Sequence, residues 1–205
     1  MLSYSDINTS KKVFVFELDD VLYPQQDYIL QVYYLFANFL EYTESFPPAA
    51  ELTEFLKKSY LQHGSEGIFK KASDVFGIDA KYEENFTRLH STAQLPLKLL
   101  LYPPVLELLN ELVQNQKAVY IFTKGNPLIQ LNKLKHLDWQ GLDRKLKVYF
   151  YDELKVLPGI DPLDYIIKEN NLTASEVALV GRDENDRKEG EKRGISYLDI
   201  TSFIG

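Results

Sequence analysis

Cysteine is absent from this 205-residue chain, so neither disulfide bonds nor thiolate metal ligands are available to it. Long apolar runs are also missing, because no stretch approaches the roughly 18–20 apolar residues that cross a lipid bilayer. The first twelve residues have polar residues throughout and lack the apolar segment of a signal peptide. We therefore expect a cytoplasmic protein without a membrane partner.

Positive charge is in short supply. The chain has 23 Lys and Arg residues against 30 Asp and Glu residues, which gives a formal net charge of −7. Binding to nucleic acid needs clustered Lys and Arg to neutralise phosphates, so we expect no nucleic-acid partner. Hydrophobic residues make up 45% of the chain, an ordinary globular composition that allows one full core and a smaller subdomain. Nothing in the sequence indicates the oligomeric state.

Five short apolar runs predict buried strands, and amphipathic helical patterns that begin near Pro103, Pro127 and Pro162 lie between the later ones. Alternating strands and helices indicate a Rossmann-like, doubly wound parallel sheet of the α/β class, whose ligands lie beyond the carboxyl ends of the strands. The predicted strands are Val13–Leu18, Ala118–Thr123, Lys147–Tyr151, Val177–Gly181 and Ile195–Asp199.

The alternation stops between the first two strands, where residues 25–94 show four helical apolar stripes and no strand pattern. Four helices can bury these stripes against one another as a small bundle. We therefore predict a helical cap domain over residues 25–94, inserted into an α/β core of residues 1–24 and 95–205. An insertion that leaves the first strand and returns before the second is expected to lie over the strand ends.

Acidic residues follow the first predicted strand, where Glu17 and Asp19 alternate and so point to the same side. Two adjacent carboxylates repel each other and need a cation, and hard oxygen ligands select Mg²⁺. Taken alone, these residues are equally consistent with a strand that runs into an acidic turn.

Two further strand ends carry polar residues. Thr123 ends the second predicted strand, and Lys124, Gly125 and Asn126 lead into a helix whose N-terminus offers free N–H groups to an anion. The fourth strand ends in Val180-Gly-Arg-Asp-Glu-Asn-Asp186, which adds further acids. Read in isolation, the former fits a plain strand-to-helix turn and the latter a solvated charged turn.

Taken together, the Leu18–Pro24 stretch, the Phe122–Asn126 stretch and the helical insertion resemble the haloacid dehalogenase (HAD) superfamily over nearly the whole chain. Within it, the chain is most similar to the subgroup with a type C1 cap that includes the pyrimidine 5′-nucleotidase-like phosphatases. The resemblance implies a Mg²⁺-dependent hydrolase that acts on a small phosphorylated metabolite through a phosphorylated carboxylate.

The resemblance also assigns roles. Asp19 matches the general acid and base, and Thr123 the hydroxyl that binds the transferred phosphoryl group beside the backbone of Lys124, Gly125 and Asn126. Asp186 matches an outer acid of the metal site, and the predicted Mg²⁺ ligands are therefore Glu17, Asp19, Asp183 and Asp186.

Three positions depart from the family pattern. Glu17 stands where the family has its nucleophilic Asp, and it is longer by about 1.5 Å. Arg182 follows Gly181 where an acid is usual, although Asp183 could supply the missing carboxylate. The family's lysine is absent before Pro158, and Lys155 is the nearest candidate to replace it. Misplacement by about 1 Å can cost roughly 100-fold in rate, so we expect weak activity.

Two alternatives to this phosphatase stay open. The chain could be a catalytically inactive HAD-like protein that binds or regulates, since it lacks the nucleophilic Asp. Carbon–halogen hydrolysis also occurs in the superfamily, but it needs an Asp nucleophile and no metal, which the pair of Glu17 and Asp19 disfavours. A receiver-type signalling domain clusters acids at strand ends too, but an insertion of about 70 residues does not fit one.

Overall fold

The computed structural model describes residues 4–182 and 184–204, which divide into two compact units. The first, here called the α/β unit, comprises the chain up to Pro24, Leu100–Gln130 and the chain from Leu137 onward. The second, here called the helical unit, comprises Gln25–Leu99 and Leu131–His136. The helical unit therefore takes in residues 95–99 and 131–136 in addition to residues 25–94.

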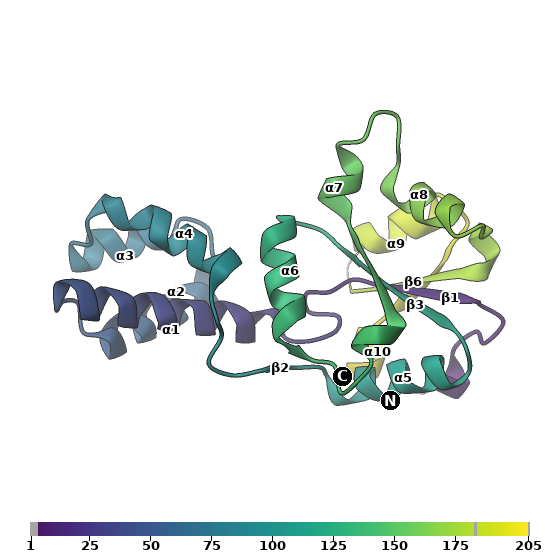
Figure 1. Ribbon diagram of the computed structural model, residues 1–205, viewed down its shortest axis with the longest axis horizontal. Coiled ribbons are helices and arrows are strands. Elements are labelled where there is room, and N and C mark those ends of the chain that lie inside the picture. Colours follow the sequence, from purple (N-terminus) through teal and green to yellow (C-terminus); the bar gives the residue numbers. More distant parts are fainter. Residues whose placement is uncertain (1–3, 183, 205) are drawn as a thin grey trace. The chain divides into compact units, whose positions relative to one another are not determined.

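The α/β unit is built on a five-stranded sheet with the strand order β5-β3-β1-β6-β7 (Figure 1). All four neighbouring strand pairs are parallel, which confirms the predicted Rossmann-like α/β fold. The strands are β1 (Val13–Phe16), β3 (Ala118–Thr123), β5 (Leu146–Phe150), β6 (Val177–Gly181) and β7 (Ser196–Asp199).

Strand β1 lies at the centre of the sheet, and all four of its residues are buried. A strand covered on both faces must be apolar throughout, which explains its Val-Phe-Val-Phe sequence. Phe16 aligns with Ile121 of β3 and with Val180 of β6. Because the three strands are in this register, the segments that follow them emerge at the same edge of the sheet.

Helices cover both faces of the sheet, with α8 and α9 on one side and α5 and α10 on the other (Figure 1). Helix α8 shows how the sequence specifies one of them, because the Asp161 carboxylate caps its first turn and its Leu163 and Ile166 pack on Val13 and Val15. The helices that follow β2 are α5 (Pro103–Gln114), α6 (Pro127–His136), α7 (Tyr151–Lys155), α8 (Pro162–Glu169), α9 (Glu184–Glu191) and α10 (Thr201–Ile204). The short strands β2 (Leu99–Leu100) and β4 (Leu137–Asp138) lie outside the main sheet.

The α/β unit is closed at the point where the chain leaves it. The backbone N–H of Tyr102 donates a hydrogen bond of 2.9 Å to the carbonyl oxygen of Leu22. Leu22 lies just before the start of the helical unit, and Tyr102 lies just after the chain has returned from it.

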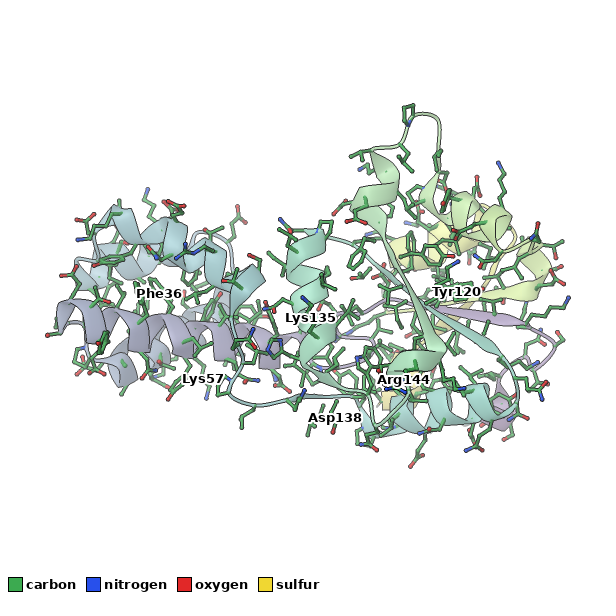
Figure 2. The ribbon with its side chains drawn as sticks, viewed as in Figure 1. Phe36, Lys57, Tyr120, Lys135, Asp138 and Arg144 are labelled. Atoms are coloured by element: carbon green, nitrogen blue, oxygen red, sulfur yellow. The ribbon has the colours of Figure 1, made fainter. Side chains whose placement is uncertain are left out.

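The helical unit contains α1 (Gln25–Glu44), α2 (Ala49–His63), α3 (Ile68–Phe76) and α4 (Glu83–Thr92). Its interior is aromatic: the Phe36 ring lies 4.9 Å from the Phe86 ring and 6.0 Å from the Phe69 ring, measured between centroids. Figure 2 shows Phe36 inside this unit. Within residues 4–182 and 184–204, no helix combines the length and apolarity of a bilayer-crossing segment.

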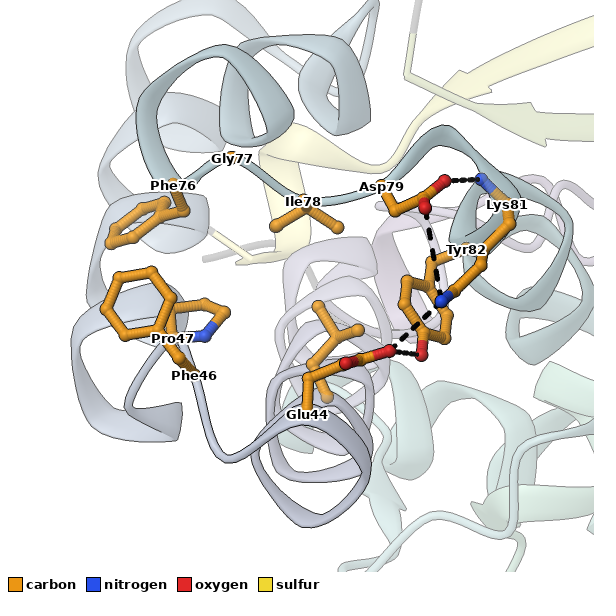
Figure 3. Close-up of a pocket in the computed structure, with 10 residues that line it drawn as sticks. Glu44, Phe46, Pro47, Phe76, Gly77, Ile78, Asp79, Lys81 and Tyr82 are labelled. Carbon is orange, nitrogen blue, oxygen red and sulfur yellow. Dashed lines mark hydrogen bonds and ion pairs between the residues drawn. The ribbon is translucent and has the colours of Figure 1, made fainter.

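A pocket of ≈ 280 Å³ lies within the helical unit, between the end of α1 and the loop after α3 (Figure 3). Its wall includes the exposed Phe46 ring together with Pro47 and Phe76. Its charged groups are paired, because the Glu44 carboxylate accepts a hydrogen bond from the Tyr82 hydroxyl and lies 3.1 Å from the Lys81 ammonium. A chemically reactive site is therefore not indicated here.

Candidate functional site

A second pocket, of ≈ 370 Å³, lies in the α/β unit where β1, β3 and β6 end. It combines acids with two cations and one amide. Its lining residues are Glu17, Asp19, Asp20, Val21, Lys124, Gln130, Arg182 and Asp186. The structure thus brings together three of the acids that the sequence pattern singles out, from two distant segments of the chain.

The turn after β1 places Glu17 and Asp19 in this pocket. The Glu17 N–H donates to the carbonyl oxygen of Val180 at 3.0 Å, which extends the pairing of β1 with β6 by one residue. Asp20 then adopts a left-handed conformation with φ of 56°, which Asp tolerates better than most residues, and its N–H donates to the Tyr23 carbonyl oxygen at 3.0 Å. The chain therefore turns back on itself immediately after Glu17 and Asp19.

Two donors hold the Asp19 carboxylate in place. The Tyr23 hydroxyl donates to Oδ1 at 2.9 Å, and the Gln130 amide donates to Oδ2 at 3.0 Å. The same amide nitrogen lies 2.9 Å from the Thr123 hydroxyl oxygen and 2.5 Å from the Lys124 carbonyl oxygen. Gln130 is buried, at 4% exposed, and so joins the two residues expected to handle the proton and the phosphate.

The sequence does not reveal Gln130, because a lone amide in the first turns of a helix has no distinguishing pattern. Its distance of seven residues from Thr123 is a weak signal, since the residue and the strand end meet only once the strand-to-helix turn is formed.

Asp186 reaches the pocket from the first turn of α9, and it is 5% exposed. Its close approach depends on Gly181, the last residue of β6. A methyl group on Gly181 would lie 2.6 Å from Asp186 Oδ2 and 2.8 Å from Asp186 Cβ. Such contacts are too short for real atoms, so a residue without a side chain is required at this strand end.

The Lys124 ammonium lies between the two buried acids. Its Nζ is 2.9 Å from Asp186 Oδ1 and 3.5 Å from Glu17 Oε1. The longer contact is an ion pair rather than a good hydrogen bond, and Glu17 Oε1 has no hydrogen-bond donor among the described residues. The sequence pattern had assigned to Lys124 a backbone role in phosphate binding and none for its side chain.

The Glu17 side chain is 12% exposed, and this burial raises the pKa of its carboxyl to about 8. The Lys124 ammonium opposes that rise, whereas the negative charges of Asp186 and Asp19 add to it. The effect of burial on the Glu17 pKa is therefore larger than the opposite effect of the Lys124 ammonium. Without a further positive charge, Glu17 is largely protonated at neutral pH.

Other predicted site residues lie elsewhere. The Gly125 N–H donates to the Asp152 carboxylate at 2.8 Å, and the Asn126 side chain caps α6 by accepting from the Leu128 N–H at 2.9 Å. Lys155 does not line the pocket, and its ammonium lies 5.6 Å from the Tyr151 ring centroid. Asp183, predicted as a metal ligand, lies outside the described residues. The catalytic and metal-binding roles inferred from the sequence stay predictions.

Arg182 lines the pocket, with its guanidinium 3.8 Å from the Asp20 carboxylate. Both side chains are well exposed, at 52% and 40%, so this ion pair contributes little to stability. Its guanidinium is instead free to turn toward an anion that enters the pocket.

The sequence matches a known protein family over most of its length. A model of the haloacid dehalogenase-like hydrolases matches residues 14–200, nearly the entire chain. The chain belongs to this family. A comparison with curated protein sequences gives no significant match.

Solved structures of other HAD-like proteins share this fold at low sequence identity. The HAD hydrolase YfnB from Bacillus subtilis, whose structure contains magnesium, is 17% identical with a TM-score of 0.58 over 91% of this chain and 85% of that chain. A HAD-like hydrolase from Xanthomonas campestris is 15% identical with a TM-score of 0.55, over 93% and 81% of the two chains. The L-2-haloacid dehalogenase from Xanthobacter autotrophicus, with chloropropionic acid covalently bound, is 17% identical with a TM-score of 0.51, over 92% and 77%.

HAD-like hydrolases commonly use Mg²⁺, and the pocket suits a divalent cation in charge and donor type. Four carboxylates line it against two cationic side chains, and Glu17 Oε1 is buried without a hydrogen-bond donor. Among the residues that the structure describes, however, no three His, Asp or Glu side chains form a ready ligand set. The donors fit Mg²⁺, but the Lys124 ammonium lies in the space between two of them.

The raised pKa of Glu17 predicts how stability depends on pH. The folded protein keeps a proton on Glu17 up to about pH 8, whereas the unfolded chain releases it near pH 4.5. The free energy of unfolding should therefore fall as pH rises through this window, by up to about 1.4 kcal/mol per pH unit. Urea denaturation in EDTA at several pH values measures the slope, and Glu17→Gln should flatten it. An unchanged slope in that variant would contradict the assignment.

The close packing of Gly181 against Asp186 predicts that replacing this glycine destabilises the protein. Gly181→Ala should lower the free energy of unfolding by about 1–3 kcal/mol, because the strand end and α9 must separate. Gly190→Ala is the matched control in α9, since a methyl group there meets its nearest atom at 3.5 Å, an ordinary contact. Chemical denaturation of both variants compares them, and an equal cost would show that the contact with Asp186 is unimportant.

Proposed function

We propose that this HAD-like hydrolase is a phosphatase of low activity that acts on a small phosphorylated metabolite with the help of Mg²⁺. The observation that carries the proposal is the meeting of Glu17, Asp19, Lys124 and Asp186 in one pocket at the carboxyl ends of β1, β3 and β6. This edge of a parallel sheet is where such folds bind their ligands.

Glu17 and Asp19 divide the chemistry in this proposal. The Glu17 carboxylate attacks the phosphorus atom, and the bond to the leaving-group oxygen breaks. Asp19 protonates that oxygen and then takes a proton from the water that hydrolyses the phosphorylated Glu17. The hydrogen bonds from Tyr23 and Gln130 support this role, because they fix the orientation of the Asp19 carboxylate.

Thr123 is 1% exposed and does not line the pocket, but its hydroxyl lies beside the lining residue Gln130, and we propose that it binds the phosphoryl group. Its hydroxyl oxygen accepts a hydrogen bond from Gln130, which leaves the hydroxyl proton for donation to a phosphoryl oxygen. Arg182 at the pocket wall adds a guanidinium for a second contact with the same group. Both contacts offset charge on the phosphoryl oxygens.

Glu17, Asp19 and Asp186 are the described residues that would hold Mg²⁺, together with the predicted ligand Asp183. When bound, Mg²⁺ supplies positive charge that favours the ionised Glu17 and neutralises phosphoryl oxygens. The raised pKa of Glu17 supports this requirement, because a protonated carboxyl is not a nucleophile.

A non-catalytic binding or regulatory protein is the second candidate. It is favoured by two observations: in the pocket the Lys124 ammonium pairs with Glu17 and Asp186, and outside it the Gly125 N–H, predicted to bind phosphate, donates to the Asp152 carboxylate. Groups predicted to bind the metal and the phosphate are therefore already paired with other residues of the chain.

Exchange of one carboxylate separates the two candidates. Glu17→Asp should raise kcat/KM for phosphate release by about tenfold or more, because it restores the shorter nucleophile of the family and in-line attack tolerates about 1 Å of misplacement poorly. The measurement is Mg²⁺-dependent phosphate release from p-nitrophenyl phosphate, nucleoside monophosphates and sugar phosphates.

Glu107→Asp serves as the matched control, since it shortens an exposed glutamate of α5 by the same group. Asp19→Asn should abolish turnover in either background. If folded wild-type and Glu17→Asp proteins release no phosphate from any of these substrates, the phosphatase proposal is rejected and the binding or regulatory function remains. Adding 2-chloropropionate to the panel tests carbon–halogen hydrolysis at the same time.

A further inference from the structure

The pocket between the end of α1 and the loop after α3 has an apolar side and a charged side (Figure 3). The Phe46 and Phe76 rings lie on the apolar side. The charged side carries Glu44, Asp79 and Lys81. A molecule that fills the pocket therefore meets aromatic rings at one end and ionised groups at the other.

The apolar side is suited to hold a small hydrophobic body. The Phe76 ring packs against the edge of Phe55, with 5.4 Å between the ring centroids, so its position is fixed by the helical unit itself. The Phe46 ring is 57% exposed, and covering it removes apolar surface from water. The pocket has a volume of ≈ 280 Å³, and a cavity of about 150 Å³ already holds benzene, so one aromatic ring with a short side chain fits.

The charged side has more negative than positive groups. The Lys81 Nζ lies 3.1 Å from Glu44 Oε1 and 3.9 Å from Asp79 Oδ2, so one ammonium serves two carboxylates. The hydrogen bond from the Tyr82 hydroxyl, aided by Lys81, holds the pKa of the Glu44 carboxyl below its usual value. The distance of 3.9 Å is too long for a hydrogen bond, so Asp79 Oδ2 keeps its capacity to accept one. The other described residues of the lining carry no charge.

We propose that this pocket of the helical unit binds a small organic cation, an ammonium group joined by a short chain to one aromatic ring. The ring lies against Phe46 and Phe76, and the ammonium donates to the Asp79 and Glu44 carboxylates. Two carboxylates and two ammonium groups then balance each other. The apolar body supplies most of the affinity, and the charge selects a cation over an anion of the same shape.

The proposed site shares no residue with the pocket at the carboxyl ends of β1, β3 and β6. Binding is reversible and involves no reaction, which agrees with the paired state of Glu44 and Lys81. The inference therefore does not rest on the proposed phosphatase function.

Three probes of one shape and different charge test the site on the full chain: phenethylamine, phenethyl alcohol and hydrocinnamate. Binding is followed at neutral pH and one ionic strength by the NMR shifts of the backbone amides. We expect phenethylamine to bind with a dissociation constant of about 1 mM, as suits a ligand of this size, and to shift the amides of Phe46, Gly77 and Lys81 most. It should bind at least about threefold more tightly than the alcohol, and hydrocinnamate should bind most weakly.

A pair of aromatic variants tests the apolar side. Phe46→Ala should weaken phenethylamine binding by about threefold or more, because the ligand loses the ring that it covers. Tyr42→Ala is the matched control, since Tyr42 is a 92% exposed aromatic residue in the last turn of α1 that does not line the pocket. Circular dichroism checks folding, and Phe46→Leu replaces Phe46→Ala if the latter does not fold.

A pair of acid variants tests the charged side. Asp79→Asn removes the excess charge but can still accept the hydrogen bond from the Lys81 N–H, and it should bring the affinities for phenethylamine and the alcohol close to each other. Asp74→Asn is its control, because it neutralises an exposed acid of α3 outside the pocket lining and should keep the preference.

Four outcomes overturn the proposal. They are the absence of saturable shifts with phenethylamine, shifts centred away from the pocket, equal affinities for the amine and the alcohol in the wild type, and equal losses in Phe46→Ala and Tyr42→Ala. Equal affinities would show an apolar pocket without charge selection. Because none of these measurements involves phosphate release, each outcome leaves the phosphatase proposal as it stands.

Discussion

Two carboxylates buried side by side repel each other, and the arrangement around Glu17 and Asp186 follows from how this repulsion is relieved. Little water reaches either group, so the repulsion must be relieved by a positive charge from the chain, by a bound ion or by a proton on one of the acids. Lys124 supplies a positive charge from the turn after β3, and the burial that remains uncompensated raises the pKa of Glu17 to about 8. Such a pair is not expected from selection for stability alone. Its presence at the ligand-binding edge of a parallel sheet indicates a functional constraint.

The sheet explains why residues so far apart in sequence share one pocket. β1 pairs with both β3 and β6 in matching register, so the segments after the three strands start from the same level. Small details then adjust the distances: the left-handed Asp20 reverses the chain, and Gly181 lets the Asp186 carboxylate approach the strand end. Gln130 links Asp19 to Thr123 from the helix that follows β3. The register of the strands therefore sets where these segments start, and the local contacts set where their side chains lie.

The strands and most helices could be predicted because their apolar residues repeat with the period of buried elements. The stripe through Phe36 and the run from Val13 to Phe16 are examples. Helix α9 was missed, since its sequence is almost wholly polar and charged and shows no apolar face. It is placed by its contacts with β6 and β7 and by the hydrogen bond from the Ile195 N–H to the Gly190 carbonyl oxygen. The side-chain roles of Lys124 and Gln130 escaped prediction for a different reason. Long flexible side chains choose partners by three-dimensional proximity, and Lys155, the nearer candidate by motif position, lies over Tyr151 instead.

The hydrogen bond between Tyr102 and Leu22 has an evolutionary consequence. It joins the two points between which some eighty residues are inserted, so the ends of the excursion are held at a fixed separation whatever lies between them. The entropic cost of closing a loop grows only with the logarithm of its length. Additions or deletions between Leu22 and Tyr102 therefore change the stability of the α/β unit little. Changes in the inserted helices can therefore accumulate while the residues at the sheet edge keep their positions.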